Sequence, residues 1–354
     1  MRYARELILV VVVLIVLVGQ GPSVAAAGLQ GLEIEKLSEW QMNKVSQDGT
    51  LLLSDSPEMV SSDGILYQDK VAGKVRLFFY HVNASVTAKK MDVVLENKGR
   101  EVAHVAVSQY GMGGPGYAWM EVGKQAMTSY LAGSQSYQIK VPPGGEVQLS
   151  TSISETAVLP NMLINGVFDF SVDRQITVKV IMLPMLEDSD QFAKSAKILP
   201  FDEPHLRGTF AGANRQLSPV RTYDPAHDGT VALTLADNVV DQYLEGIDAT
   251  DGTKVVNYGN YGVVYNVLFP TKNSGKIAYY FVPMGGAYAG AIGIKHPDVN
   301  WSPLATPMGK VYFGDEKMTD FTFLGTYDGG DSLSFTFSPP GASNLPVEIV
   351  IVPQ

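Results

Sequence analysis

Two glycine-rich segments of this chain resemble each other, and this repetition constrains the fold more than any other feature of the sequence. Each copy consists of an apolar run, an Asn-x-Gly turn, a second apolar run and a Met-Gly-Gly loop with a tyrosine. The turns and loops are Asn97-Lys98-Gly99 with 112–118 in the first copy, and Asn273-Ser274-Gly275 with 284–289 in the second. They lie about 170 positions apart, a spacing too long for a solenoid repeat, so they predict a duplicated domain.

The rest of the sequence is typical of an all-β protein. The 354 residues include 35 glycines and 20 prolines, and these separate short runs rich in valine, tyrosine and threonine. Apolar and polar residues alternate at 74–80, 175–180 and 332–337. This alternation predicts strands with one face on a core and the other in water.

Three local patterns predict other elements. Segments 120–132 and 236–244 have helical spacing of apolar residues and predict two short helices. Asn165-Gly166 lies between two apolar runs and predicts a two-residue hairpin turn.

The sequence therefore predicts two tandem, duplicated, antiparallel β-sandwich domains that follow a signal peptide. We expect the signal peptide at 1–27, the first domain at 28–200 and the second at 201–354. The boundary is placed near 200 because segment 184–225 is rich in proline and charge.

The first 27 residues predict secretion. Arg2 and Arg5 precede the apolar run 7–18, and Ala25-Ala26-Ala27 provides small residues before a cleavage point at Gly28. Twelve apolar residues span about 18 Å as a helix, less than the ~30 Å of a bilayer core, which favours cleavage over a retained anchor. We expect a secreted, cell-wall-associated protein that is not an integral membrane protein after cleavage. The absence of cysteine leaves stability to the cores and the sheets.

The charge of the chain bears on its partners. The formal net charge is −10, and Lys89-Lys90 is the only basic cluster visible in the sequence. A chain of this charge repels phosphate backbones, so we expect no nucleic-acid partner. The negative charge also disfavours simple Coulomb attraction to anionic wall polymers, unless divalent cations bridge the two.

The two Met-Gly-Gly loops and their aromatic neighbours are the candidate ligand-binding residues. Glycine lets a backbone approach a ligand closely, and exposed aromatic rings stack on the apolar faces of sugars. Neither loop has the lysine and hydroxyl residue that follow the glycines of a phosphate loop. A tight turn that closes a sandwich explains the same glycines. The candidate residues are Tyr110, Gly113, Gly114, Tyr117, Trp119, Gly285, Gly286 and Tyr288.

No catalytic motif is present in the sequence. Neither HExxH nor Gly-x-Ser-x-Gly occurs, and the five histidines lack zinc-ligand spacing. A pair of catalytic carboxylates for glycoside hydrolysis has no sequence signature. We predict no cofactor. Calcium stays an alternative, without a specific motif, at four acidic turns: 187–190, 224–228, 248–251 and 328–331.

Several phrases carry a resemblance to a known family. They cover most of the mature chain and comprise 55–60, 64–69, 76–83, 205–210, 260–263 and 283–290. They resemble uncharacterised exported proteins of spore-forming Gram-positive bacteria, some labelled by association with copper amine oxidase N-terminal-like domains. The resemblance implies an envelope protein. It implies no oxidase activity, because this chain lacks a copper-binding set of histidines.

Three functions follow as hypotheses. The first is a non-enzymatic, exported cell-envelope protein that binds wall glycan or another surface protein. The second is a secreted hydrolase that acts on carbohydrate. The third is a structural surface protein that self-assembles through exposed strand edges or the glycine-rich loops.

Overall fold

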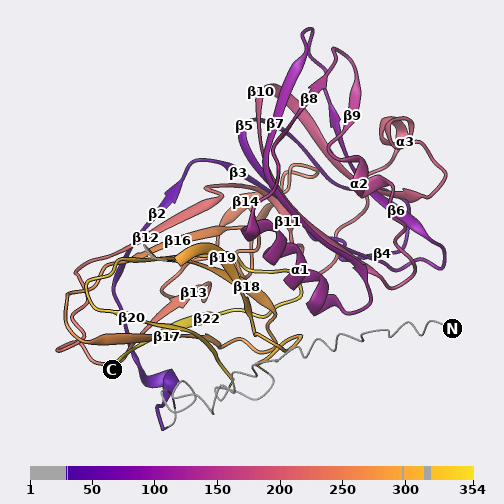
Figure 1. Cartoon of the computed structure of the whole chain (residues 1–354). Coiled ribbons are helices and arrows are strands. Elements are labelled where there is room, and N and C mark those ends of the chain that lie inside the picture. Colours follow the sequence, from indigo (N-terminus) through magenta and orange to yellow (C-terminus); the bar gives the residue numbers. More distant parts are fainter. Residues whose placement is uncertain (1–28, 30, 297–298, 315–319) are drawn as a thin grey trace, which may run out of the picture. The chain divides into compact units, whose positions relative to one another are not determined.

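Two long strands form the centre of the largest sheet. β5 (Gly64–Asn83) and β10 (Leu163–Pro184) pair antiparallel along almost their whole length (Figure 1). Their register shifts between Val172 and Ile176, which divides the pair into two stretches. β7 pairs with the first stretch of β10 and β6 with the second. The computed structural model describes residues 29, 31–296, 299–314 and 320–354, and Ile34–Gln354 forms one compact unit.

The described strands form three sheets. The eleven-stranded long sheet contains β3 (Thr50–Ser54), β4 (Met59–Val60), β5, β6 (Lys89–Glu96), β7 (Ala103–Gly116), β8 (Tyr137–Val141), β9 (Glu146–Gln148), β10, β11 (Arg207–Ala211), β14 (Glu245–Ile247) and β15 (Lys254–Val256). The five-stranded sheet has the order β1 (Ser38–Glu39), β13 (Val231–Leu235), β22 (Val347–Pro353), β17 (Lys276–Pro283) and β20 (Thr322–Asp328). The six-stranded sheet has the order β19 (Val299–Thr306), β18 (Gly290–His296), β21 (Leu333–Phe337), β16 (Val264–Phe269), β12 (Asn214–Pro219) and β2 (Met42–Gln47).

The five-stranded and six-stranded sheets pack face to face. Aromatic rings meet across them, with 5.5 Å between the centroids of Tyr279 and Phe335 and 5.8 Å between those of Phe281 and Phe337. All four rings belong to one apolar cluster. The two sheets therefore form a sandwich around an aromatic-rich core.

The long sheet is buried on both faces at its centre. Residues 75–83 of β5 are all buried. Leu77 and Phe79 pack into one apolar cluster, whereas Phe78 and Tyr80 pack into the cluster shared with the sandwich. The prediction that every second residue of 74–80 faces water is therefore wrong, because a second layer covers the expected solvent face.

The predicted mostly β character is confirmed, and the predicted purely antiparallel pairing is wrong. Parallel pairs occur at β1·β13, β3·β5, β4·β5 and β12·β16, so the sheets are mixed. Strand pairing also crosses the boundary expected near residue 200: β3 pairs with β11, and β2 pairs with β12. The division into two domains at that position stays a prediction, and the hydrogen-bonded sheets continue through it.

The described helices are few: the 3-10 turn η2 (Ile34–Lys36), α1 (Trp119–Ala132), α2 (Thr151–Ser154) and α3 (Ser189–Ser195). α1 confirms the helix predicted at 120–132. Segment 236–244 is not helical, because the Asp237 carboxylate accepts the backbone N–H groups of Val239 and Asp241 in a turn. Asn165-Gly166 is not a hairpin turn and lies within β10, where the Asn165 amide donates to the Phe79 carbonyl at 2.6 Å.

The repeated segments occupy different structural contexts. The first Met-Gly-Gly lies inside β7, whereas the second lies in the bend between β17 and β18. A duplicated domain would place the two loops at equivalent positions, and the structure does not. The predicted signal peptide lies outside the described residues, and no described helix is long and apolar enough to cross a bilayer.

Candidate functional site

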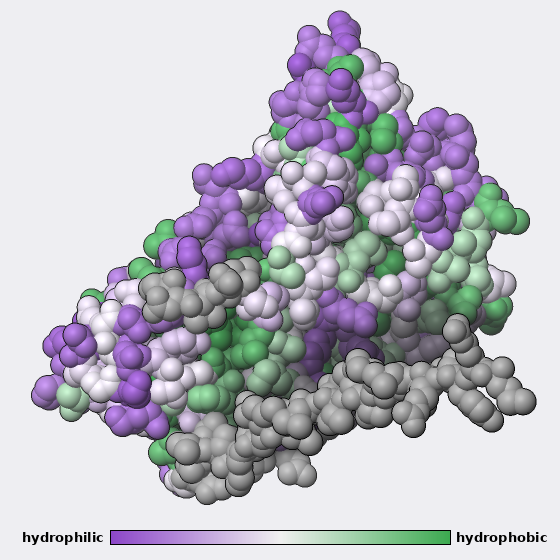
Figure 2. All heavy atoms as spheres, in the orientation of Figure 1, coloured by the Kyte–Doolittle hydropathy of each residue, from purple (hydrophilic) through white to green (hydrophobic). Residues whose placement is uncertain are grey.

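A groove beside α1 is the strongest candidate binding site. It lies between the outer face of α1 and the segment that follows β19, and its volume is about 720 Å³. Apolar and polar side chains both line it: Met112, Glu121, Lys124, Gln125, Thr128, Ser129, Ala132, Ala305, Gly309, Lys310 and Val311. We call this the α1 groove. Figure 1 shows α1 between the long sheet and β18, and in Figure 2 hydrophilic, intermediate and hydrophobic side chains are mixed in that region.

The glycines of β7 fix the inner face of α1. A Cβ atom added to Gly113 would lie 1.9 Å from the Val122 carbonyl oxygen, and one added to Gly111 would lie 2.2 Å from the Tyr130 nitrogen. Only glycine allows the helix to lie this close to the strand. The same face buries Ala126 and the side chain of Val122. The first glycine-rich copy thus serves helix packing, and this packing places the outer face of α1 in the groove.

Lys124 fixes the opposite wall of the α1 groove. Its ammonium group donates to the carbonyl oxygens of Pro307 at 2.6 Å and of Lys310 at 2.8 Å. Burial lowers the pKa of Lys124. The wall segment exposes apolar surface, since Met308 is 56% and Val311 47% exposed. The groove therefore combines an apolar surface with hydrogen-bonding groups.

The first-copy candidate residues are partly brought together. Gly113 and Gly114 lie against α1 and its Val122 side chain. Tyr110 packs on Phe168 on the far side of the sheet, with 5.3 Å between ring centroids. Tyr117 is 62% exposed just before α1, and the half-buried Trp119 donates its indole N–H to the Asn161 carbonyl at 3.2 Å.

The second-copy candidate residues lie in packed structure. A Cβ atom on Gly285 would lie 2.1 Å from the Leu345 carbonyl oxygen, and Gly286 has a φ of 118°. Tyr288 is fully buried against Phe281 and Phe313, so its ring does not join Tyr117 and Trp119 on a surface. These placements explain the second glycine pair by packing.

A buried serine–histidine pair was not predicted from the sequence. Ser54 Oγ lies 2.8 Å from His81 Nε2, and His81 Nδ1 lies 2.9 Å from the Pro57 carbonyl oxygen. A carbonyl only accepts, so Nδ1 carries the proton and Nε2 accepts from the serine hydroxyl. Burial lowers the pKa of His81 to about 4. Both side chains are fully buried, so a substrate has no access to this pair.

A pair of glutamates shares one threonine across three adjacent strands. Glu39 accepts from the Thr234 hydroxyl at 2.7 Å, and Glu348 lies 3.5 Å from the same hydroxyl. One carboxyl oxygen of Glu348 is buried and has no hydrogen-bond partner within the described structure. Burial, together with the charge of Glu39, raises the pKa of Glu348 to about 7. Two strands far apart in sequence bring these glutamates together, so no local motif marks them.

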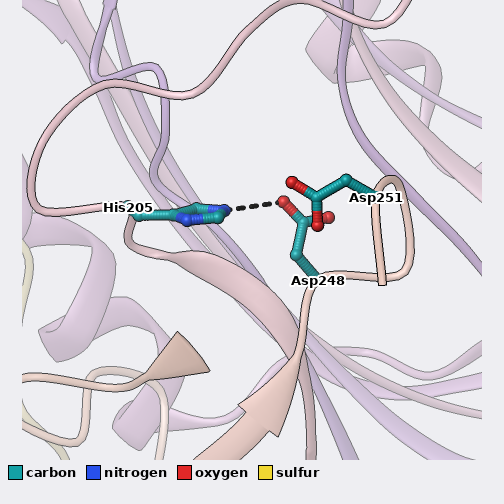
Figure 3. A group of neighbouring side chains, drawn as sticks. All are labelled: His205, Asp248 and Asp251. Atoms are coloured by element: carbon teal, nitrogen blue, oxygen red, sulfur yellow. Dashed lines mark hydrogen bonds and ion pairs between the residues drawn. The ribbon is translucent and has the colours of Figure 1, made fainter. Parts of the chain in front are cut away.

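His205, Asp248 and Asp251 form a group with metal-ligand chemistry (Figure 3). Asp248 is already fully bonded: one oxygen accepts from His205 at 2.8 Å and from Arg207 at 2.7 Å, and the other accepts twice from Thr250. The buried guanidinium supplies the positive charge that a cation would supply. The arrangement therefore fits an Arg–Asp–His network better than a metal centre.

In the other acidic turns, side chains and backbone groups of the protein bind the carboxylates that calcium would use. Asp224 binds Lys272 at 3.0 Å, and Asp228 binds both terminal nitrogens of Arg221 at 2.7 and 2.8 Å. Asp188 caps α3, and Asp328 and Asp331 pair with Lys276 and His296. Calcium binding stays an alternative prediction, and a calcium ion would have to replace these contacts.

Comparisons with known proteins identify no family for this chain. No family model matches it, and no curated protein matches it. A weak structural likeness exists to a Paenibacillus xanthan lyase, with 10% identity and a TM-score of 0.18 over 92% of this chain and 27% of that chain. Another exists to the ANXUR2 extracellular domain from Arabidopsis thaliana, with 9% identity and a TM-score of 0.17 over 87% of this chain and 97% of that chain. The 11S allergen from Cocos nucifera is similar at 9% identity and a TM-score of 0.16, with 87% and 90% covered. This chain spans about a quarter of the lyase, and likenesses at these TM-scores carry no argument about fold or function.

Proposed function

We propose that this chain is a non-enzymatic, exported cell-envelope protein and that the α1 groove binds wall glycan. The observation that carries the proposal is the makeup of the groove. Its volume of about 720 Å³ lies within the range of small-molecule sites, on the order of 300–1,000 Å³. Sugars present apolar ring faces and hydroxyl edges, so they need apolar contacts and hydrogen-bonding groups side by side.

The side chains of the groove match that need. Met112, Ala305 and Val311 supply apolar contacts, and Gln125 and Thr128 supply donors and acceptors. Glu121 supplies one negative charge, and Lys124 and Lys310 supply two positive charges, so the groove has a formal net charge of only +1. A neutral glycan fits this balance better than a highly charged polymer.

The test is retention of the full chain on purified cell wall, followed by titration with soluble wall-glycan fragments. Ser129→Arg places a long side chain in the α1 groove, and Ser136→Arg makes the same change at an exposed position after the helix. We expect Ser129→Arg to weaken glycan binding at least about tenfold, equivalent to about 1.4 kcal/mol, and Ser136→Arg to leave it unchanged.

Three outcomes count against the proposal. Equal binding by both variants would exclude the groove, and failure to bind any wall fraction would exclude the glycan ligand. If a purified surface protein binds in the same groove and glycan does not, the ligand of the groove is a protein and not a glycan. Amino-terminal sequencing of the exported chain tests the localisation, because cleavage as predicted leaves Gly28 as the first residue.

A second candidate function is carbohydrate hydrolysis, and the glutamate pair favours it. A carboxyl group with a pKa of about 7 is still about half protonated at neutral pH, as a general acid for glycoside cleavage requires. Glu39 would supply the second carboxyl group. We expect any turnover of a polysaccharide panel to be lost in Glu348→Gln, whereas a wild-type chain without turnover excludes this function.

A further inference from the structure

A second hollow lies at the far end of β7 from the α1 groove. Its volume is about 510 Å³, and four cationic side chains line it against one carboxylate. The lining residues are Lys70, Asn97, Lys98, Gly99, Arg100, Glu101, Arg174, Gln175, Ile176 and Thr177. We call this the basic hollow. In Figure 2 hydrophilic side chains cover the end of β7, β8 and β10 that lies away from α1.

Three separate segments assemble the basic hollow, so the sequence does not show it. Lys70 comes from β5, Lys98 and Arg100 from the turn before β7, and Arg174 from the register shift in β10. Each segment alone carries too few charges to form a basic run. The structure thus contains a basic cluster beyond Lys89-Lys90, within a chain of net charge −10.

Hydrogen bonds of a buried asparagine hold the turn that carries two of these cations. Asn97 is 1% exposed, and its amide donates to the carbonyl oxygens of Glu101 at 2.8 Å and of Val141 at 2.9 Å. Its side-chain oxygen accepts from the Gly99 N–H at 2.9 Å. The Asn97 side chain makes these three hydrogen bonds across the turn, and Arg100 forms no ion pair within the described chain.

Much of the positive charge in the hollow is unneutralised. Within the described chain, Lys70 and Arg100 are exposed and form no ion pair, and Lys98 pairs with Glu96 at 3.2 Å while 68% exposed. Arg174 pairs with Glu101. Exposed cations that hold no partner are available to a ligand at little desolvation cost.

The Asn-x-Gly turn of the second glycine-rich copy can be compared with the turn that carries Lys98 and Arg100. Ser274 stands where the first copy has Lys98. Lys276 stands where the first copy has Arg100, and it pairs with Asp328 at 2.6 Å. The second turn therefore carries no free cation. It also differs in conformation from the first, since Asn273 is exposed and Gly275 has a φ of 66°.

We propose that the basic hollow binds the phosphate groups of a chain-like polyanion. Arginine binds phosphate oxygens through a planar fork of donors, and lysine adds point charges around it. The two cations without a carboxylate partner, Lys70 and Arg100, come from different segments of the hollow, so neighbouring phosphates along a chain can contact both. Because the acidic chain repels polyanions overall, binding requires this local concentration of positive charge. The site is separate from the α1 groove and does not depend on glycan binding there.

The test is calorimetric titration of the full chain with linear polyphosphate at low and at physiological ionic strength. Lys70→Gln combined with Arg100→Gln removes the two unpaired cations, and Lys254→Gln combined with Lys295→Gln removes two exposed cations elsewhere. We expect the first double variant to raise the dissociation constant at least about tenfold, since hydrogen bonds to charged groups are the stronger ones. We expect the control pair to change it less than about twofold and Lys98→Ser, which copies the second turn, to fall between.

Each other outcome overturns a defined part of the proposal. If polyphosphate does not bind at low ionic strength, the proposed site is excluded. If both double variants lose affinity equally, polyphosphate binds through diffuse surface charge and not in the basic hollow. Equal binding of polyglutamate excludes selectivity for phosphate, and inorganic phosphate binding as tightly as polyphosphate excludes the chain-like ligand. Ser129→Arg keeps polyphosphate binding if the two sites are independent, so the glycan proposal and this one fail separately. Thermal melting by circular dichroism verifies that every variant is folded.

Discussion

Arg76 joins parts of the chain that are far apart in sequence, and its removal gives the sharpest test of the fold. Its guanidinium donates to both oxygens of Asp169 at 2.6 and 2.8 Å, and to the carbonyl oxygens of Ala213 at 2.7 Å and of Gly262 at 3.2 Å. It is 5% exposed. The Tyr130 hydroxyl of α1 donates to the same carboxylate at 2.8 Å. One side chain thus connects the long sheet with two loops beyond residue 200.

The expected magnitude follows from these contacts. Arg76→Met keeps most of the apolar stem and removes all four hydrogen bonds, leaving two carbonyl groups and a half-buried carboxylate without their donor. Breaking one side of a buried ion pair costs about 3–5 kcal/mol. Asp169 is 23% exposed and keeps the bond from Tyr130, so we expect about 3 kcal/mol, at the lower end of that range.

Urea unfolding at neutral pH measures this loss, with Arg174→Met as the matched control. Arg174 also pairs with a carboxylate, but it is 44% exposed, so its replacement costs at most about 1 kcal/mol. We also expect a single unfolding transition for the wild type, because the Arg76 contacts cross the predicted domain boundary. Equal losses in the two variants, or two well-separated wild-type transitions, would refute the reasoning.

Three further predictions concern single groups. Gly113→Ala places a Cβ atom 1.9 Å from the Val122 carbonyl oxygen, so we expect the free energy of unfolding to fall by about 1–3 kcal/mol and binding in the α1 groove to weaken. In the control Gly133→Ala the new Cβ atom contacts nothing, so this variant measures only the effect of a φ of 84°. Burial raises the pKa of Glu348 from 4.5 to about 7, so between these pH values the folded chain keeps a proton that the unfolded chain has lost. The free energy of unfolding therefore falls as pH rises through this interval. We expect urea unfolding of Glu348→Gln to lack this part of the pH dependence. Burial lowers the pKa of His81 from 6.5 to about 4, so its contribution to stability is lost as pH falls through that interval, and an NMR titration that protonates the folded imidazole near pH 6.5 would contradict it.

The sequence predicted local structure well where one segment decides it. The turn at Asn97, the strands of both repeats and the helix at 120–132 depend on short-range patterns, and all lie where expected. The alternation at 74–80 was misleading because a second layer, contributed partly by residues beyond 200, covers the face expected in water. Asn165-Gly166 was misleading because the side chain of Asn165 bonds across the sheet to Phe79.

The candidate sites show the same limit. Gly113 was identified as a ligand-binding residue, but its use is visible only once α1 lies against β7. The basic hollow and the Glu39–Glu348 pair each need strands that are distant in sequence, so no spacing rule marks them. Tyr117 was identified through its residue type alone, and the sequence does not show that it is exposed between β7 and α1.

The differences between the two copies of the repeat now carry more functional meaning than their similarity. Both copies need glycine for close packing, yet the first packs a helix and the second packs the segment at Leu345. Only the first copy is followed by α1 and its groove, and only its Asn-x-Gly turn holds unpaired positive charge. The duplication stays a prediction from the sequence. Under it, both copies would keep what folding requires, so features confined to one copy are the better candidates for binding. The α1 groove and the basic hollow are both features of this kind, which is why binding experiments belong at the two ends of β7.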